Sequence, residues 1–393
     1  MRKRHAIVAA LGTTQTLAWA SSYYLPAVLA APMARDLGLS TPWIYAALSL
    51  GLGVSAVLGR SLGRKIDVQG GRRVLCGSNI AFAAGLCALA MASGPLSLVF
   101  AWLVLGIAMA GGLYESAFAS LTRLYGHDSR NAITGITIIA GFSSTVGWPL
   151  SALLEHTFGW RGACATWATI HLCLGLPLNA WALRHANGEG RRESAVANDA
   201  AAAPPHPSNQ GMLPLAFMFT ASGMVSIGMA TNLPRLFAAM GVVPAVAIAA
   251  ASLMGPAQVA ARVLEFGARR RINPLISARV ATALHPLAAL TIAIGGAPVI
   301  AVFSIVHGAG TGMLTITRGT LPLALYGPAG YGERMGRLTA PARIGQALSP
   351  FLVGLAIDKL GASTLIISSG LSLAALLALS WINIPRASAS KTC

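Results

Sequence analysis

The chain has 393 residues, of which 55% are hydrophobic and only 10% are charged, whereas about a quarter of the residues in a soluble domain are charged. Its net charge of +17 would suit a protein that binds nucleic acid, but the basic residues lie in short segments between apolar runs. Composition therefore argues against a soluble domain and a nucleic-acid partner, and it indicates a protein embedded in a lipid bilayer.

Apolar runs of about twenty residues, the length that a helix needs to cross a bilayer, recur along the whole chain. The first run follows Arg2-Lys3-Arg4 and so resembles a secretory signal, but it is too long for one and many more runs follow. We therefore predict an uncleaved first helix and twelve membrane-spanning helices, at residues 6–31, 42–62, 74–93, 97–123, 131–155, 162–184, 212–238, 243–265, 275–294, 298–323, 335–357 and 361–384.

A polar segment, residues 187–210, follows the sixth run and has the composition of a flexible linker. The parts on either side repeat at an offset near 200 residues, which favours duplication. We predict an all-α membrane protein with an N-terminal six-helix bundle at 1–186 and a pseudo-symmetric C-terminal six-helix bundle at 211–393. The matching pairs are Ala108 with Ala309, Gly111 with Gly312, Leu113 with Leu314, Tyr125-Gly126 with Tyr326-Gly327, and Pro149 with Pro350.

The distribution of Lys and Arg predicts the orientation. With the amino terminus inside, 22 of the 28 fall in segments on the inner side and only four on the outer side. Because basic residues are enriched in cytoplasmic loops, we expect both termini and the linker 187–210 in the cytoplasm, with the chain in a cell membrane such as a bacterial inner membrane.

A short basic stretch, residues 63–73, separates the second and third runs. On spacing alone it is a solvated turn whose cations set the topology, and a loop so short forces its flanking helices to pack antiparallel. The spacing of its glycines, its acid and its basic pair also resembles the loop signature of the major facilitator superfamily. Those positions are Gly63, Asp67, Gly70, Arg72 and Arg73.

The resemblance implies a fold and a mode of action. It implies two six-helix bundles that rock about a central site, with Asp67 pairing with helix ends and cations across the two halves as part of a cytoplasmic gate. Val68 stands where a basic residue usually follows that Asp, which removes one cation from the gate. The turn Gly159-Trp160-Arg161 resembles both monocarboxylate-type and drug-efflux members, so the subgroup stays open.

Three charged residues lie well inside the predicted spans: Glu115, Arg318 and Arg343. A buried ion in a bilayer costs several kcal/mol, so each should face a partner or a wet cavity. By resemblance all three lie on helices that line the central cavity. An ion pair between the two halves, or side chains that reach the membrane surface, would explain them equally well.

Polar side chains repeat at helical spacing on three spans, which indicates faces turned away from lipid. One such face carries His307, Thr311, Thr315 and Arg318, and another carries Thr339, Arg343 and Gln346. We predict a substrate-binding and coupling site that comprises Glu115, Arg318, Arg343, Gln15, Trp19, Tyr23, Asn232 and Thr315.

No motif of a catalytic, phosphate-binding or metal-binding site occurs, so we expect neither an enzyme nor a cofactor. The five cysteines lack metal-type spacing and suit packing in apolar segments. The sequence favours a monomeric transporter that moves a small organic anion with protons. Proton-driven efflux of amphipathic compounds is the alternative within the class, and a transporter-like sensor that moves nothing is the alternative outside it.

Overall fold

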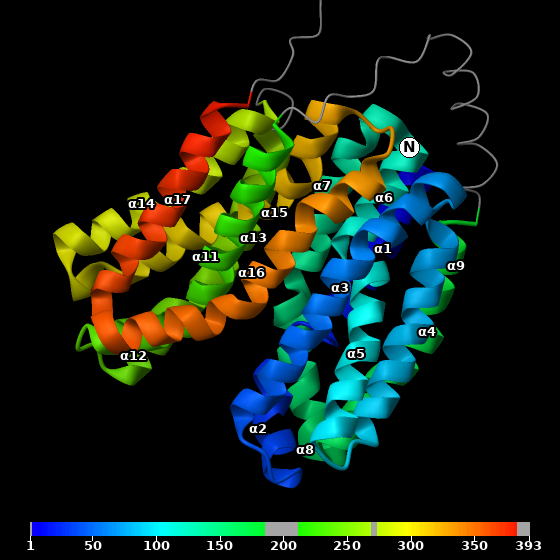
Figure 1. Ribbon diagram of the computed structural model, residues 1–393, viewed down its shortest axis with the longest axis horizontal. Helices are drawn as coiled ribbons and strands as arrows, with labels where there is room; N and C mark the ends of the chain where they lie inside the picture. The colour runs from blue at the N-terminus through cyan, green and yellow to red at the C-terminus, as the bar shows by residue number, and fades with distance from the viewer. Residues whose placement is uncertain (1, 185–210, 269–272, 383–393) are drawn as a thin grey trace, which may run out of the picture.

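The computed structural model describes residues 2–184, 211–268 and 273–382, and every regular element within these ranges is a helix. The predicted linker 187–210 lies outside the described residues. The helices gather into two bundles, one formed by α1 to α9 and the other by α11 to α17 (Figure 1).

The first bundle begins with α1 (Arg2–Ala20) and α2 (Pro26–Asp36), which form the first predicted span and are separated by a break at residues 21–25. Gly159, with a φ of 68°, turns the chain inside α8, so that element holds parts of two spans. The remaining helices of this bundle are α3 (Thr41–Gln69), α4 (Gly71–Ala90), α5 (Pro95–Gly112), α6 (Tyr114–Tyr125), α7 (Ser129–Ile139), α8 (Ser143–Ile170) and α9 (Leu176–Ala182).

The second bundle has the same plan with fewer breaks. Its eighth span is divided between α12 and α13, and its tenth is one continuous helix, α15. Its helices are α11 (Met212–Ala239), α12 (Pro244–Ser252), α13 (Met254–Ala268), α14 (Pro274–Gly295), α15 (Ile300–Tyr326), α16 (Tyr331–Leu360) and α17 (Thr364–Ser380).

Eight stretches of the described helices are long and apolar enough to cross a membrane. The stretch 95–182 turns at residues 126–128 and at Gly159, so it makes three crossings. The stretch 331–380 turns at residues 361–363 and makes two. With α1 and α2 as the first crossing, the described residues form the twelve spans that the sequence predicts.

Equivalent glycines end equivalent helices in the two bundles. Gly126 follows α6 with a φ of 54°, and Gly327 follows α15 with a φ of 70°. Residues with a side chain rarely adopt such angles, so glycine is needed at both helix ends. This agreement supports the repeat that the sequence indicates.

The stretch predicted as the loop 63–73 is almost entirely helical, which corrects that expectation. Gly63 and Asp67 lie in the last turns of α3, and α4 begins at Gly71, so Gly70 alone, with a φ of 85°, connects the two helices. The predicted span ends too early, at residue 62, because α3 continues past its apolar part to carry its polar end against α16.

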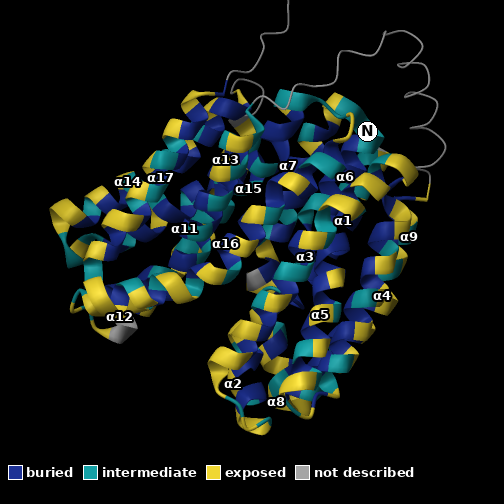
Figure 2. Cartoon of the chain, viewed as in Figure 1, coloured by how far each residue is buried: buried dark blue, intermediate teal, exposed yellow. Residues whose placement is uncertain are grey.

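The two bundles share a hydrophobic core at one end of the molecule and have separate cores at the other. Figure 2 shows the bundles in contact where α3 ends and α16 begins, and apart near α2, α8 and α12. The shared cluster includes Leu11, Ile66, Phe118, Phe219 and Leu338. The separate clusters are centred on residues such as Trp102 and Trp167 in the first bundle and Phe237 and Phe303 in the second.

Glycines allow α3 and α16 to meet at the shared end. Gly59 and Gly63 on α3 face Gly336 and Gly332 on α16, and each pair is four residues apart, so each lies on one side of its helix. Small residues at this spacing let helix backbones touch. The contact between the bundles therefore depends on residues that have no side chain.

Each bundle is fastened at the other end by an ion pair. Asp36, at the end of α2, pairs with Arg161, and it also accepts a hydrogen bond from Trp160 Nε1 at 3.1 Å. Arg235 on α11 pairs with Asp358 on α16. The partners are 125 residues apart in the first pair and 123 in the second, at matching places in the two repeats.

Candidate functional site

The site begins at a break in the fourth span. Helix α5 ends at Gly112, and α6 begins at Tyr114. Gln15 Nε2 donates a hydrogen bond to the Gly112 carbonyl at 2.7 Å, and Ser116 Oγ donates one to the Ala110 carbonyl at 3.2 Å. These bonds replace helix bonds lost at the break. The break places Glu115 in the first turn of α6, where the helix dipole favours a carboxylate.

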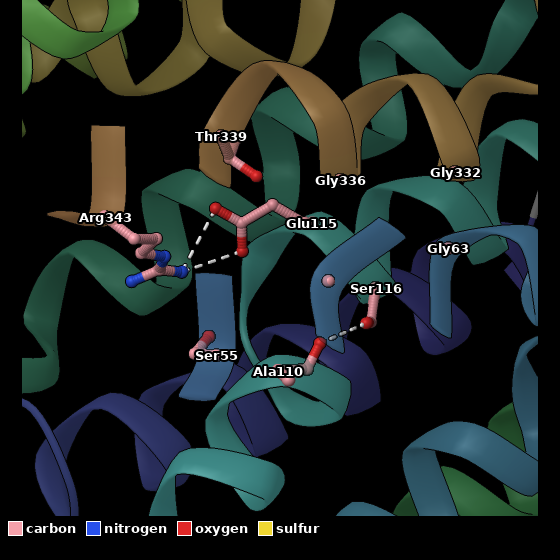
Figure 3. A pocket seen from close by; sticks show the side chains of 10 residues that line it. Ser55, Gly63, Ala110, Glu115, Ser116, Gly332, Gly336, Thr339 and Arg343 are labelled. Atoms are coloured by element: carbon pink, nitrogen blue, oxygen red, sulfur yellow. Dashed lines mark hydrogen bonds and ion pairs between the residues drawn. The ribbon is translucent and has the colours of Figure 1, made fainter. Parts of the chain in front are cut away.

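Glu115 forms an ion pair with Arg343 across the two bundles. Arg343 Nη2 lies 2.9 Å from Glu115 Oε2 and 3.1 Å from Oε1 (Figure 3). The Arg343 side chain is only 6% exposed, and that of Glu115 is 27% exposed. The guanidinium also lies 5.8 Å from the centre of the Trp19 ring. A buried cation with a partly open partner can exchange that partner for another anion.

A small pocket lies beside this pair and reaches the contact between α3 and α16. Thr339 and the pair itself form one side of it, and Ser55 and Ser116 contribute hydroxyl groups (Figure 3). The remaining lining residues are Gly59, Gly63, Ala110, Gly332 and Gly336. The ion pair thus lies on the path from the centre of the molecule to the shared end.

Arg318, the second predicted cation, lies in the C-terminal bundle without a carboxylate partner among the described residues. Its Nη2 reaches the Phe219 carbonyl at the long distance of 3.5 Å, and its buried Nε has no hydrogen-bond partner. A Cβ atom on Gly223 would lie 3.0 Å from that Nη2, so the guanidinium lies directly against α11, next to Gln346. An uncompensated buried cation favours binding of an anion.

A third cation, Arg262 on α13, was missed from the sequence. The predicted span 243–265 includes Arg262, but it was counted only among the basic residues of the inner side; α13 continues to Ala268, and Arg262 is only 6% exposed. Its guanidinium donates to the Gly312 carbonyl at 3.4 Å and to Thr315 Oγ1 at 3.3 Å. A Cβ atom on Gly141 would lie 2.4 Å from its Nη1, so Arg262 too lies at the contact between the bundles. The available signal was an arginine at the end of an apolar run.

Aromatic side chains of the first bundle line the same region. Trp19 packs against Tyr23, Tyr24 and Tyr114, with ring centres 5.2, 6.2 and 5.0 Å away. Tyr23 lies close enough to Arg343 and Arg318 for their charges to act on its hydroxyl group. The buried Trp19 Nε1 has no partner among the described residues. The region therefore presents flat apolar surface together with hydrogen-bond donors.

The predicted site residues fall into two groups. Glu115, Arg343, Trp19 and Tyr23 come together, and Arg318 and Thr315 lie on the facing helix α15. Gln15 is fully buried; its Nε2 is bonded to the Gly112 carbonyl, and its Oε1 has no hydrogen-bond partner among the described residues. Asn232 lies apart: its side chain binds the Gly228 and Pro350 carbonyls, nine residues or ~13 Å along α11 from Gly223.

The predicted gate residues also fall into two groups. Both Asp67 oxygens accept backbone hydrogen bonds at 2.8 Å, one from Gly332 and one from Glu333, so Asp67 caps the start of α16 in the other bundle. Glu333 in turn pairs with Arg60 on α3. Arg72 and Arg73 are exposed on α4, and no described hydrogen bond or ion pair joins them to Asp67.

Nothing in the described residues forms a metal centre, since no three His, Cys, Asp or Glu side chains gather closely enough there. The chemistry at hand is reversible: binding of anions by arginine, and exchange of a proton at a carboxylate. These groups lie between two bundles that meet at only one end. Two helical bundles around such groups are the architecture of a membrane transporter.

Comparisons with known proteins give its family. A family model described as Major Facilitator Superfamily matches residues 11–295, and the chain belongs to that superfamily, whose members are membrane transporters. No curated protein sequence matches it.

Two solved structures show the same fold. The human organic anion transporter MFSD10 (TETRAN) has a TM-score of 0.73 at 15% identity, over 96% of this chain and 99% of that one. The MFS proton:xylose symporter XylE bound to 6-bromo-6-deoxy-D-glucose has a TM-score of 0.64 at 14% identity, over 96% and 95%.

Proposed function

We propose that this protein carries a small organic anion together with a proton, as a secondary active transporter that works by alternating access. The observation that carries the proposal is the imbalance of charge between the bundles. Arg262 and Arg343 are buried and Arg318 is half-buried, and among the described residues the carboxylate that forms an ion pair with any of the three is Glu115. An anionic substrate would supply the missing negative charge.

The ion pair provides a way to couple the proton. An anion that binds Arg343 competes with Glu115 for the same guanidinium, whose Nη2 holds both carboxylate oxygens. Once displaced, Glu115 would repel the anion unless it takes up a proton. One anion and one proton therefore enter together, and Glu115 protonation removes the competitor from Arg343.

The basic residues give this site an orientation. With both termini in the cytoplasm, the end where α3 meets α16 is the cytoplasmic end, and the structure corresponds to a state closed on that side. We propose a monomer in a cell membrane such as a bacterial inner membrane, with no catalytic activity and no nucleic-acid partner. Two relatives in fold fit this scheme, since one is an organic anion transporter and the other a proton symporter.

Proton-driven efflux of amphipathic compounds is a second candidate. The cluster of Trp19, Tyr23, Tyr24 and Tyr114 favours it, because stacked rings bind flat apolar molecules with little regard to their charge. In that case the arginines and Glu115 would form an ion-pair network between the bundles, and Gln15, Trp19, Tyr23 and Asn232 would hold a neutral or cationic substrate.

Transport by purified protein in proteoliposomes separates the two candidates. The assay would use a small panel of organic anions and cationic amphiphiles, with pH gradients of either sign. We expect an anion to be taken up faster when the side it leaves is acidic. Arg318→Gln and Arg343→Gln should weaken its binding strongly, whereas Glu115→Gln should keep binding and lose the pH dependence.

The control is Arg235→Gln, which removes an exposed arginine from the ion pair with Asp358, away from the central site. It should leave anion binding unchanged. If both central arginine variants bind the anion normally and only lose stability, the arginines are structural and the efflux candidate replaces the anion transporter.

A further inference from the structure

A second small pocket lies inside the C-terminal bundle, between α11, α14, α15 and α17. It is separate from the pocket at Glu115 and shares no lining residue with it. Hydroxyl groups and two histidines line it among small and apolar residues. The residues are Ser222, Val225, Ser226, Ala281, Thr282, His285, His307, Gly310, Thr311, Leu314 and Ser372.

The two histidines belong to a chain of hydrogen bonds whose direction can be worked out. Ser368 Oγ donates to the Leu365 carbonyl at 3.2 Å, and a carbonyl oxygen can only accept. With the hydroxyl proton of Ser368 directed at Leu365, we infer that His285 is the donor in the 2.9 Å contact between its Nε2 and Ser368 Oγ. His285 Nδ1 is then bare and accepts from His307 Nδ1–H, also at 2.9 Å.

This direction leaves His307 Nε2 without a proton. The atom is buried, in a side chain that is only 2% exposed, and no described group forms a hydrogen bond to it. Ser222 Oγ, which lines the same pocket and is 3% exposed, also has no partner among the described residues. A bare imidazole nitrogen in a polar pocket is a base.

The buried histidine of the other bundle is arranged differently. His171 has a partner for each ring nitrogen, Ser21 Oγ at 2.7 Å and Asn79 Oδ1 at 3.0 Å. Its ring also stacks on Phe82. His171 is therefore a satisfied packing residue, and the free nitrogen distinguishes His307.

We propose that this pocket is a proton-binding site and that His307 Nε2 is the atom that receives the proton. A hydronium ion in the pocket gives up one O–H bond and leaves as water, while an Nε2–H bond forms. The His307 Nδ1–H bond to His285 stays in place, so the positive charge is spread over two hydrogen-bonded rings.

Hydroxyl groups would have to solvate this charge in place of a counter-ion. The polar groups that face the pair are Ser222 and Ser226 on α11, Thr282 on α14, Thr311 on α15, and Ser368 and Ser372 on α17. None of the described lining residues is charged. Ser222 Oγ, which lines the pocket and has no hydrogen-bond partner among the described residues, can accept from the new N–H.

The pocket is also connected to the central site by one face of α15. Thr311 lines the pocket and lies 3.4 Å from Ser226, and its carbonyl accepts from Thr315 Oγ1. Thr315 Oγ1 in turn accepts from Arg262. A proton on His307 therefore lies at the end of a polar row that reaches a cation at the contact between the bundles.

Nitrogen-15 NMR of histidine-labelled full-length protein in lipid bilayers tests the site without a substrate. Ring nitrogen shifts distinguish the two neutral tautomers from the doubly protonated ring. At about pH 8 we expect His307 with the proton on Nδ1 and a bare Nε2, and conversion to the doubly protonated form as the pH is lowered. His171 should not change over that range.

His307→Asn identifies the signal. An asparagine amide can still donate to His285 Nδ1 but has no basic nitrogen at the Nε2 position, so the bond between the helices is retained. The matched control is His171→Asn. If His307→Asn does not fold, coupling between the two Nδ1 atoms across their 2.9 Å contact identifies the pair in the wild-type protein. A proton on His307 Nε2 at high pH, or a ring that stays neutral throughout, overturns the proposal.

Discussion

The backbones of Gly63 and Gly332 touch. A Cβ atom built on Gly63 would lie 2.0 Å from the carbonyl oxygen of Gly332, far inside van der Waals contact. This relationship joins α3 of one bundle to α16 of the other. Alanine at either position would push the two bundles apart where they share their core.

The first prediction concerns this contact. Gly63→Ala should remove most of the population in which the two bundles are closed at this end. Spin labels at the exposed residues Arg73 and Ala329, one on each bundle, would report the change as a longer distance. Gly53→Ala on the same helix is the control, because a Cβ there meets no atom within 4 Å. An unchanged distance in Gly63→Ala would contradict the prediction, because it would show that the contact between α3 and α16 has room for a methyl group.

A second prediction concerns Asp67. Asparagine has one acceptor oxygen, so Asp67→Asn loses one of the two bonds to the start of α16 and the charge that strengthens the other. Hydrogen bonds to a charged group contribute about 1.5–3 kcal/mol each. The closed population should therefore fall about tenfold or more, with transport lost and expression near normal. Asp128→Asn, the same change at an exposed position, is the control. Wild-type transport by Asp67→Asn would mean that residues 63–73 only set the topology and do not form a gate.

The third prediction tests the Glu115–Arg343 ion pair by thermal unfolding. Removing either partner leaves a charge with poor solvation, whereas removing both does not. Glu115→Gln and Arg343→Gln should each lower the unfolding temperature. The double variant should lose less stability than the sum of the two single losses. Strictly additive losses would mean that the two charges do not stabilise each other in the membrane.

A fourth prediction follows from Asp36. The hydrogen bond from Arg161, with that from Trp160, lowers the pKa of the Asp36 carboxyl below its ordinary value. Its contribution to stability is therefore complete above the ordinary Asp pKa of about 3.9 and is lost as the pH falls through the lowered value. Asp36→Asn should be less stable than wild type near neutral pH, and the difference should vanish in strong acid. A difference that does not depend on pH would point to packing and not to charge.

The fifth prediction is topological. Arg73 and Ser93 lie near opposite ends of α4 and are both exposed. In a background without the native cysteines, Ser93→Cys should react with an impermeant thiol reagent in intact cells. Arg73→Cys should react only in inside-out vesicles. The reverse pattern would invert the predicted orientation and the side on which the bundles are closed.

The spans and the repeat were predictable because both depend on short stretches of consecutive residues. Apolar runs of helical length mark the crossings, and Gly126 and Gly327 mark equivalent helix ends. Glu115 and Arg343 were recognisable as costly charges within apolar runs. The sequence offered an ion pair between the two halves as only one of several explanations for these charges. It could not decide among them, because the register of α6 against α16 depends on how the two bundles dock.

Residues at helix ends and breaks were harder to predict. Arg262 was counted only as a basic residue of the inner side, because the end of an apolar run does not show how far its helix continues or what the helix packs against. Gln15 was predicted as a substrate contact, but a stripe of polar residues does not show that its Nε2 binds the carbonyl of Gly112, where a neighbouring helix breaks. The spacing of Gly59 with Gly63 and of Gly332 with Gly336 was visible, but the sequence alone does not show which pair meets which.

The ion pairs at the far end of the two bundles have their charges exchanged. In the first repeat the acid, Asp36, comes first in the chain, and in the second repeat the base, Arg235, does. A folding chain that docked the start of one repeat onto the end of the other would therefore bring Asp36 to Asp358, or Arg235 to Arg161. Both mistaken pairings join like charges, which repel. Duplication makes two similar sets of helices that could be confused during assembly, and the exchanged charges let each half recognise its own.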